Sequence, residues 1–132
     1  MLNNNPKERD IQKKSNAANS YAWVLICKIA ECIPAPKDVV YLKMLKRYGQ
    51  SELINVLPCV KIEEYAKYYE DAGECVIDGV KYNSYFVYKG VSEYDARQMA
   101  KFIDGVVWEA KDLNIPTETP EELERIKTLW GA

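Results

Sequence analysis

The segment that most restricts the fold lies near the N-terminus and is apolar on almost every face of a helix. Ser15 or Asn16 can cap this helix, and Pro34 with Pro36 ends it near Cys32. Apolar residues at helical spacing form one stripe along it: Ala18, Ala22, Leu25, Ile29 and Cys32. Its other faces are also apolar, with Tyr21, Trp23, Val24, Ile26 and Cys27. Such a helix has to be buried on nearly all sides. In a chain of 132 residues, this favours oligomerisation.

The rest of the chain predicts an α+β fold. Residues 1–14 are polar and lack periodicity, so we expect a mobile polar arm followed by a single domain over 15–132. We expect two N-terminal helices, a small antiparallel β-sheet with an Asp-Gly hairpin, and two C-terminal helices. After the first helix, we expect a helix over 38–48 that ends at Gly49, a strand over 51–57 and a short helix over 62–71. Strands over 75–77 and 80–88 are expected to form a hairpin through the turn Asp78-Gly79. A long helix that begins at Ser92 and a last helix that begins at Thr119 complete the chain.

The long C-terminal helix carries a second apolar stripe. Steps of three and four residues separate its members, Ala96, Met99, Ile103, Val106, Ala110 and Leu113. Gly105 inside this helix indicates a close backbone contact. We expect a homodimer in which residues 21–33 and 99–113 contribute to a shared core. The competing arrangement is a monomer whose sheet covers one side of the first helix and whose C-terminal helices cover the other.

The composition argues against catalysis. Histidine is absent, which excludes Ser-His-Asp hydrolases, Cys-His proteases and His-ligated metal centres. The acidic pairs are sequence neighbours that point apart on a helix, and no Gly-rich phosphate loop is present. We therefore expect no enzyme activity, no cofactor and no metal site.

Four cysteines bear on the compartment. None forms a Cys-x-x-Cys pair, and the N-terminus lacks the apolar core of a secretory signal. Two disulfides in a secreted protein would fit an even count, but the apolar setting of Cys27 and Cys32 favours reduced, mostly buried thiols in a cytoplasmic protein. No apolar run reaches the length of a membrane span, so we expect no membrane contact.

Charge is divided unevenly along the chain. Residues 1–49 hold nine basic and four acidic residues, whereas residues 50–132 hold nine basic and sixteen acidic ones. A basic half is typical of polyanion binding, although a mixed solvated surface is the better explanation of the charge alone. In and next to the strand over 80–88, tyrosines are interleaved with lysines, which suggests that its tyrosine rings stack on the bases of a single-stranded nucleic acid. The alternation of the strand places Tyr85 and Lys89 on one face, which we expect to be free if the other packs inward.

Several stretches resemble the NinB/Orf-like recombination proteins of phages. The segment 14–23 is similar to the family pattern Arg-Ser-x-x-Gln-Asn-x-x-x-Trp, with Lys14 in place of Arg and Ala18 in place of Gln. The segments 92–111 and 119–131 resemble the C-terminal helices of versions from phages of Gram-positive bacteria. Residues 40–49 and 68–70 add to the match in between, so the resemblance extends over roughly residues 14–131, through scattered positions and without a catalytic signature.

The resemblance implies a phage or prophage recombination mediator in the bacterial cytoplasm. Such a protein is a homodimer that binds single-stranded DNA, associates with single-stranded-DNA-binding protein and assists recombinase loading. Trp23 of the matched pattern is expected to be core rather than contact. The predicted DNA-binding residues are Lys13, Lys14, Asn19, Lys43, Lys46 and Arg47 by charge and polarity, and Tyr85 and Lys89 as a stacking site. The competing hypothesis is a non-enzymatic interaction module that acts on a host protein without binding DNA.

Overall fold

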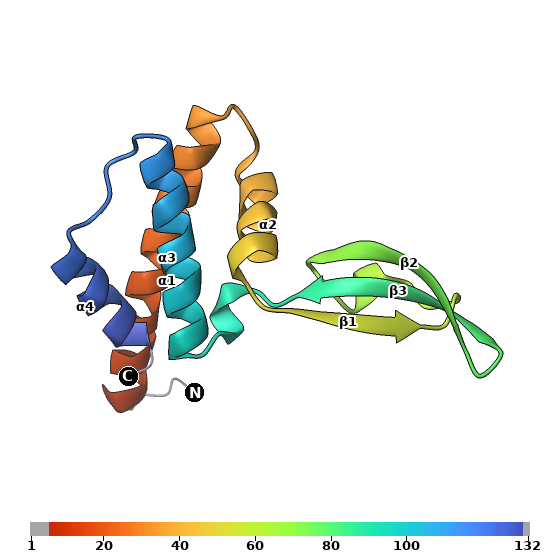
Figure 1. Ribbon diagram of the computed structural model, residues 1–132. Helices are drawn as coiled ribbons and strands as arrows, with labels where there is room; N and C mark the ends of the chain where they lie inside the picture. Colours follow the sequence, from red (N-terminus) through yellow and green to blue (C-terminus); the bar gives the residue numbers. More distant parts are fainter. Residues whose placement is uncertain (1–5, 131–132) are drawn as a thin grey trace.

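The computed structural model describes the backbone of residues 6–130 and the side chains of residues 17–130. Its helices form one body, from which a three-stranded antiparallel sheet projects as an arm (Figure 1). The predicted α+β class, with helices before and after the sheet, is confirmed. The elements in chain order are α1 (Pro6–Cys32), α2 (Lys37–Tyr48), β1 (Ser51–Val56), η1 (Ile62–Glu64), β2 (Tyr69–Ile77), β3 (Val80–Tyr88), η2 (Val91–Glu93), α3 (Ala96–Asp112) and α4 (Pro120–Trp130).

The hydrophobic core lies among the four helices. α1 packs against α2, α3 and α4, which bury most of the apolar stripe predicted for it. Met99, Ile103, Val106 and Ala110 of the α3 stripe are buried in the same core, whereas Ala96 is exposed and Leu113 is half-buried. Most of the two stripes that we expected two copies to share is therefore covered within one chain. The sheet leads away from α1, so the competing arrangement in which it covers that helix is wrong (Figure 1). The largest fully buried side chains are Leu25, Ile26, Val40, Leu45, Met99, Phe102, Ile103 and Val106.

The predicted start of the first helix is wrong. α1 begins at Pro6 rather than at Ser15 or Asn16. Proline suits the first helical position, and the Lys, Glu, Arg and Gln residues that follow favour helix. Residues 1–5 of the predicted arm lie outside the described residues.

The starts of the two C-terminal helices are set by side-chain caps. α3 begins at Ala96 and not at Ser92, because Asp95 is its N-cap. The Asp95 carboxylate accepts a hydrogen bond from Gln98 N at 2.8 Å, and Asp95 N donates to Gln98 Oε1 at 3.0 Å, which completes a capping box. The predicted cap of α4 is confirmed, since Glu122 N donates to Thr119 Oγ1 at 3.2 Å.

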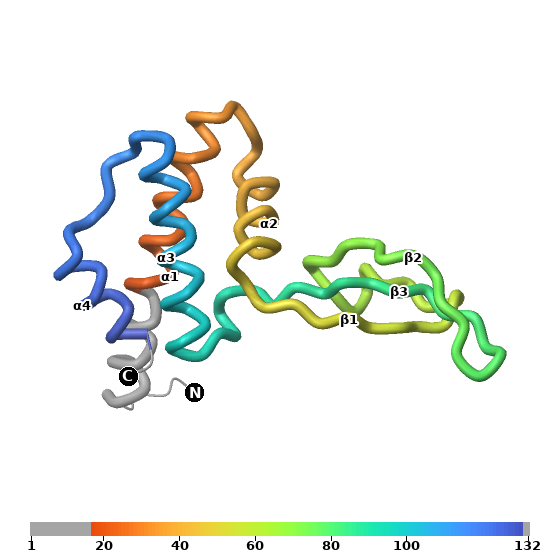
Figure 2. The backbone as a smooth tube through the Cα atoms, viewed as in Figure 1, coloured from red at the N-terminus to blue at the C-terminus, as the bar shows by residue number. Residues whose placement is uncertain are grey.

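The arm is inserted between α2 and α3, with strand order β1-β3-β2 (Figure 2). Asp78 and Gly79 have φ angles of 50° and 79°, as the predicted type I′ turn requires, so the hairpin is confirmed. The short helix predicted over 62–71 is wrong. Only η1 is helical there, and Tyr69 already pairs with β3. Gly73 does not end a helix but lies, with a φ of 93°, where the register of β2 shifts.

The two faces of the arm differ in exposure. β1 and β2 are both antiparallel to β3 and therefore parallel to each other, so their connection, residues 57–68, has to cross one face of the sheet. On the face that we call the covered face, the apolar and aromatic side chains Ile54, Val56, Tyr69, Tyr85 and Val87 are half-buried. Ile62 of the connection is buried outside the helical core, and the half-burial of these side chains indicates that the connection crosses this face. The opposite face, which we call the open face, carries Leu53, Cys75, Ile77, Val80, Tyr82 and Phe86.

All four cysteines are free. Cys32 and Cys59 are exposed and Cys27 and Cys75 are half-buried, so the expectation of mostly buried thiols is wrong. Among the described residues, no helix combines the length and hydropathy that crossing a membrane requires.

Candidate functional site

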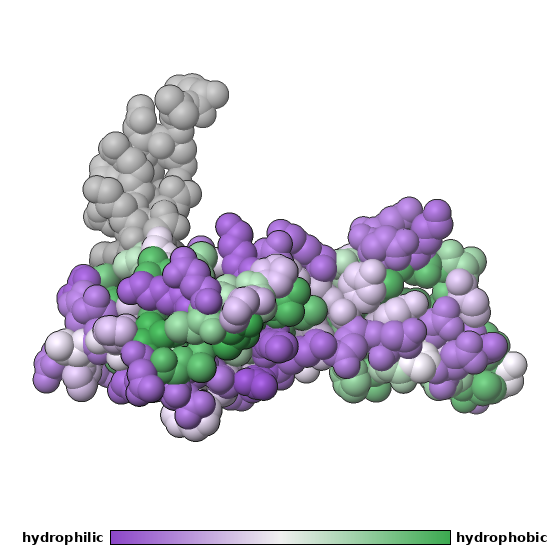
Figure 3. Space-filling model, turned by 90° about the horizontal axis from the view of Figure 1, so that it is seen from above, coloured by the Kyte–Doolittle hydropathy of each residue, from purple (hydrophilic) through white to green (hydrophobic). Residues whose placement is uncertain are grey.

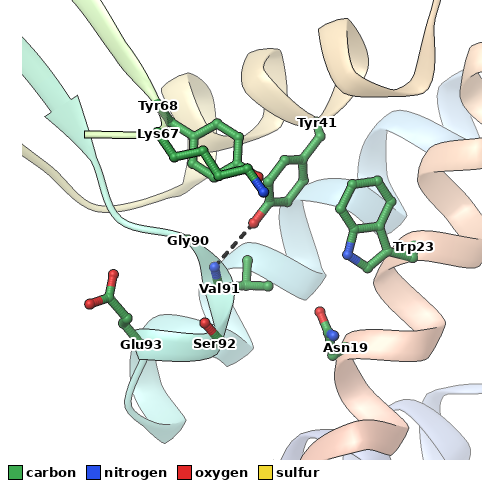
Figure 4. A pocket seen from close by; sticks show the side chains of 9 residues that line it. All are labelled: Asn19, Trp23, Tyr41, Lys67, Tyr68, Gly90, Val91, Ser92 and Glu93. Atoms are coloured by element: carbon green, nitrogen blue, oxygen red, sulfur yellow. Dashed lines mark hydrogen bonds between the residues drawn. The ribbon is translucent and has the colours of Figure 1, made fainter. Parts of the chain in front are cut away.

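A pocket of about 330 Å³ lies where the arm joins the helical body (Figure 4). α1 and α2 supply one wall, the segment before β2 supplies another, and the segment from β3 to η2 forms the floor. We call it the junction pocket, and its lining residues are Asn19, Trp23, Tyr41, Lys67, Tyr68, Gly90, Val91, Ser92 and Glu93.

Three aromatic rings form one side of the junction pocket. The rings of Trp23 and Tyr41 stack with centroids 4.5 Å apart and an interplanar angle of 27°. Tyr68 meets Tyr41 edge to face at 5.2 Å. Val91 N donates a hydrogen bond to the Tyr41 hydroxyl at 3.1 Å, and burial raises the pKa of Tyr41 to about 12. Tyr41 is therefore held in place by its packing and its hydrogen bond, and it is uncharged at neutral pH.

Asn19 and Lys67 supply the polar chemistry of the junction pocket. The Asn19 side chain points into the pocket, and its buried Oδ1 has no hydrogen-bond partner among the described residues (Figure 4). A buried amide oxygen without a partner costs about 1–3 kcal/mol, so a ligand that donates to it gains that energy. Lys67 Nζ lies 5.4 Å from the centroid of Tyr68, in a cation–π contact at the pocket wall.

The sequence-predicted residues do not gather at this pocket. Only Asn19 lines it. Lys46 is paired with Glu70, and Arg47 Nη1 donates to Glu109 Oε1 at 2.7 Å. Lys43 is exposed on α2, and the side chains of Lys13 and Lys14 lie outside the described residues.

The predicted stacking site, Tyr85 and Lys89, does not lie on a free face of the sheet. Tyr85 lies on the covered face, where its ring meets Tyr69 edge to face at 6.0 Å. Lys89 is exposed at the base of the arm, where its backbone N–H donates to Gln50 O at 3.0 Å. The face expected to be free is thus the one that the connection covers.

A second polar cluster forms where α2 meets α3. The half-buried carboxylate of Glu109 accepts hydrogen bonds from Arg47 and from the Tyr48 hydroxyl, each at 2.7 Å. Burial, followed by the hydrogen bond to Glu109, raises the pKa of Tyr48 to about 12. Arg47 therefore holds two helices together and is not a free cation.

Sequence reasoning did not predict the other lining residues as contacts, among them Trp23, Lys67 and Tyr68. Trp23 follows Asn19 by four residues, so the two side chains share one face of α1. This spacing, within the segment that resembles the NinB/Orf-like pattern, was the available signal. Lys67 and Tyr68 belong to the Lys-Tyr interleaving noted in the sequence, but only the folded arm brings them to α1.

The described residues hold no group of three or more cysteine, aspartate or glutamate side chains arranged to bind a metal ion. Comparison of the chain with models of known protein families, with curated proteins and with solved structures finds no match.

Proposed function

We propose that this protein binds single-stranded DNA at the junction pocket and acts as an accessory protein of phage recombination. The pocket carries the proposal because it combines stacked aromatic rings, an amide with an unpartnered oxygen, and a lysine. Proteins that hold single strands use aromatic rings to stack bases and cations to follow the phosphates.

The chemistry of the pocket favours a nucleobase over other small groups. Its volume is at the lower end for small-molecule sites, which suits one flat ring system. The Asn19 amide offers one donor and one acceptor, a combination that matches the hydrogen-bonding edge of a base. Lys67 occupies the face of Tyr68 and would repel a cationic ligand, but it would attract the phosphate next to the base.

The cellular setting is part of the proposal and rests on the resemblance. It comprises action in the bacterial cytoplasm and association with single-stranded-DNA-binding protein and a recombinase. No step in this role requires catalysis.

The decisive experiment measures the binding of a labelled single-stranded oligonucleotide and its duplex at two salt concentrations. We expect the single strand to bind more tightly, and Asn19→Leu and Lys67→Gln each to weaken binding several-fold. Lys111→Gln, an exposed lysine on α3 outside the pocket, is the matched control and should bind like the parent chain.

Two results would argue against the proposal. If no oligonucleotide binds at low salt, the protein is better explained as an interaction module acting on a host protein. If binding is present but Asn19→Leu and Lys67→Gln leave it unchanged, the junction pocket is not the DNA site.

A further inference from the structure

The open face of the arm exposes large apolar side chains that no other part of the described chain covers. Leu53 is 55% exposed and its cross-strand partner Phe86 40%. At the tip of the hairpin, Ile77 is 45% exposed and its partner Val80 44%. Hydrophobic side chains are visible on the arm away from the body (Figure 3).

These four apolar side chains lie on one face of the sheet. A small sheet gains its stability by burying at least one apolar face, and the connection 57–68 covers only the covered face. Clustered rather than scattered apolar side chains are typical of an interaction surface.

The charges on the open face select the class of partner. Glu70 is its only charged residue at positions paired in the ladder, and Lys46 neutralises that carboxylate. The one cation at a paired position of the ladder, Lys81, projects from the opposite face. Lys46, the lysine that reaches this face, is already paired with Glu70, so the face offers no free cation to a phosphate backbone and favours a protein surface of matching apolar character.

We propose that this partner is the open face of a second copy of the chain. A two-fold axis near the middle of the sheet would place the Ile77–Val80 pair of one arm over the Leu53–Phe86 pair of the other. Each apolar pair then meets an apolar pair, and no like charges are brought together. Between them, the hydroxyl of Ser84 already donates to Asn55 Oδ1 at 2.6 Å, so the centre of the face can be buried without leaving that hydroxyl unpaired.

This interface differs from the helical one expected from the sequence. α1 and α3 are covered within one chain, whereas the arm extends into solvent and leaves its open face accessible (Figure 1). Closed two-fold pairing of identical surfaces is the commonest form of oligomer.

The test is light scattering of the full chain across a concentration series. We expect a mass of twice 15.2 kDa at micromolar concentration. Phe86→Lys and, separately, Val80→Lys should each shift the mass to that of one chain, because each puts two lysines into an apolar seam. Trp108→Lys, a change of a 61% exposed residue on α3, is the control and should remain a dimer.

The circular dichroism of each variant checks the fold, and both arm variants should be folded because the replaced side chains are exposed. A mass of one chain for the parent protein at every concentration would overturn the proposal. Dimers that persist in both arm variants would also overturn it, since the interface would then lie elsewhere. A parent monomer that gains mass only when a host protein is added would assign the open face to that other protein instead.

Discussion

The ring of Tyr48 lies directly against the backbone of Gly105, so closely that a Cβ on residue 105 would overlap the ring carbons. The close contact predicted for Gly105 is therefore confirmed. It brings α2 and α3 together at the point where Tyr48 also donates its hydroxyl hydrogen to Glu109.

We predict that Gly105→Ala lowers the free energy of unfolding. Overpacking of a filled site costs about 1–3 kcal/mol, whereas the better helix propensity of Ala returns at most about 1 kcal/mol. Urea denaturation measures the difference, and Lys101→Ala, an exposed change on the same helix, serves as control. A more stable Gly105→Ala variant would contradict the close packing.

We predict that Asp95→Ala destabilises the protein by about 1 kcal/mol, because it removes the N-cap of α3. Ser92→Ala should change stability by less than about 0.5 kcal/mol, since Ser92 is exposed and is not the cap. Thermal unfolding measures the loss of stability in each variant and shows whether Asp95 or Ser92, the start expected from the sequence, caps α3. Equal losses in both variants would argue against the capping box.

We predict that stability falls in alkaline solution as the buried tyrosines ionise. Folding raises the pKa of both Tyr41 and Tyr48 to about 12, so the neutral phenols favour the folded state. Their contribution is fully present below pH 10 and is lost as pH rises from about 10 towards 12. Denaturation at several pH values measures this, and tyrosinate absorbance should show that the phenols of Tyr41 and Tyr48 ionise only as the pH approaches about 12. Simultaneous ionisation of all tyrosines in the folded protein would contradict the prediction.

We predict that Glu109→Gln moves the ionisation of Tyr48 towards lower pH and leaves Tyr41 unchanged. The carboxylate helps to raise the pKa of Tyr48, and Tyr41 has no contact with it. The variant should also lose about 1 kcal/mol of stability, because Arg47 loses its charged partner. Absorbance titration of the variant beside Tyr48→Phe assigns the shifted phenol.

We predict that Lys67→Gln lowers the salt dependence of single-strand binding by about 0.7 in the slope of log K against log salt, the amount expected for one phosphate contact. Lys46→Gln should change this slope less, because Lys46 is paired with Glu70. Binding isotherms at four salt concentrations distinguish the two. An unchanged slope in Lys67→Gln would show that Lys67 does not contact a phosphate of the bound strand.

Local signals account for the parts of the fold that could be predicted. Gly49 ends α2, the Asp78-Gly79 turn joins β2 to β3, and Thr119 caps α4, and each depends on residues close in sequence. The order of the strands could not be predicted in this way. The Leu53–Phe86 pairing joins residues 33 positions apart, and the path of the connection over one face follows only from that pairing.

The same distinction applies to the candidate site. Asn19 was found through the resemblance, and Trp23 was interpreted as core because an apolar helix gives no sign of which face meets a pocket. Lys46 and Arg47 looked like free cations, but Glu70 and Glu109, which pair with them, come from segments far along the chain. Ion pairs of this kind depend on tertiary structure.

The two ends of the arm meet at its base, where Lys89 N donates to Gln50 O. A turn of a few residues could therefore join these positions and leave the helical body closed. A segment attached in this manner is free to change in length and sequence during evolution, while the helices remain bound by the packing of their shared core. The junction pocket takes Trp23 and Asn19 from the constrained part and Lys67 and Tyr68 from the adaptable one. Changes in the arm can thus alter the lining of the junction pocket without any change to the scaffold.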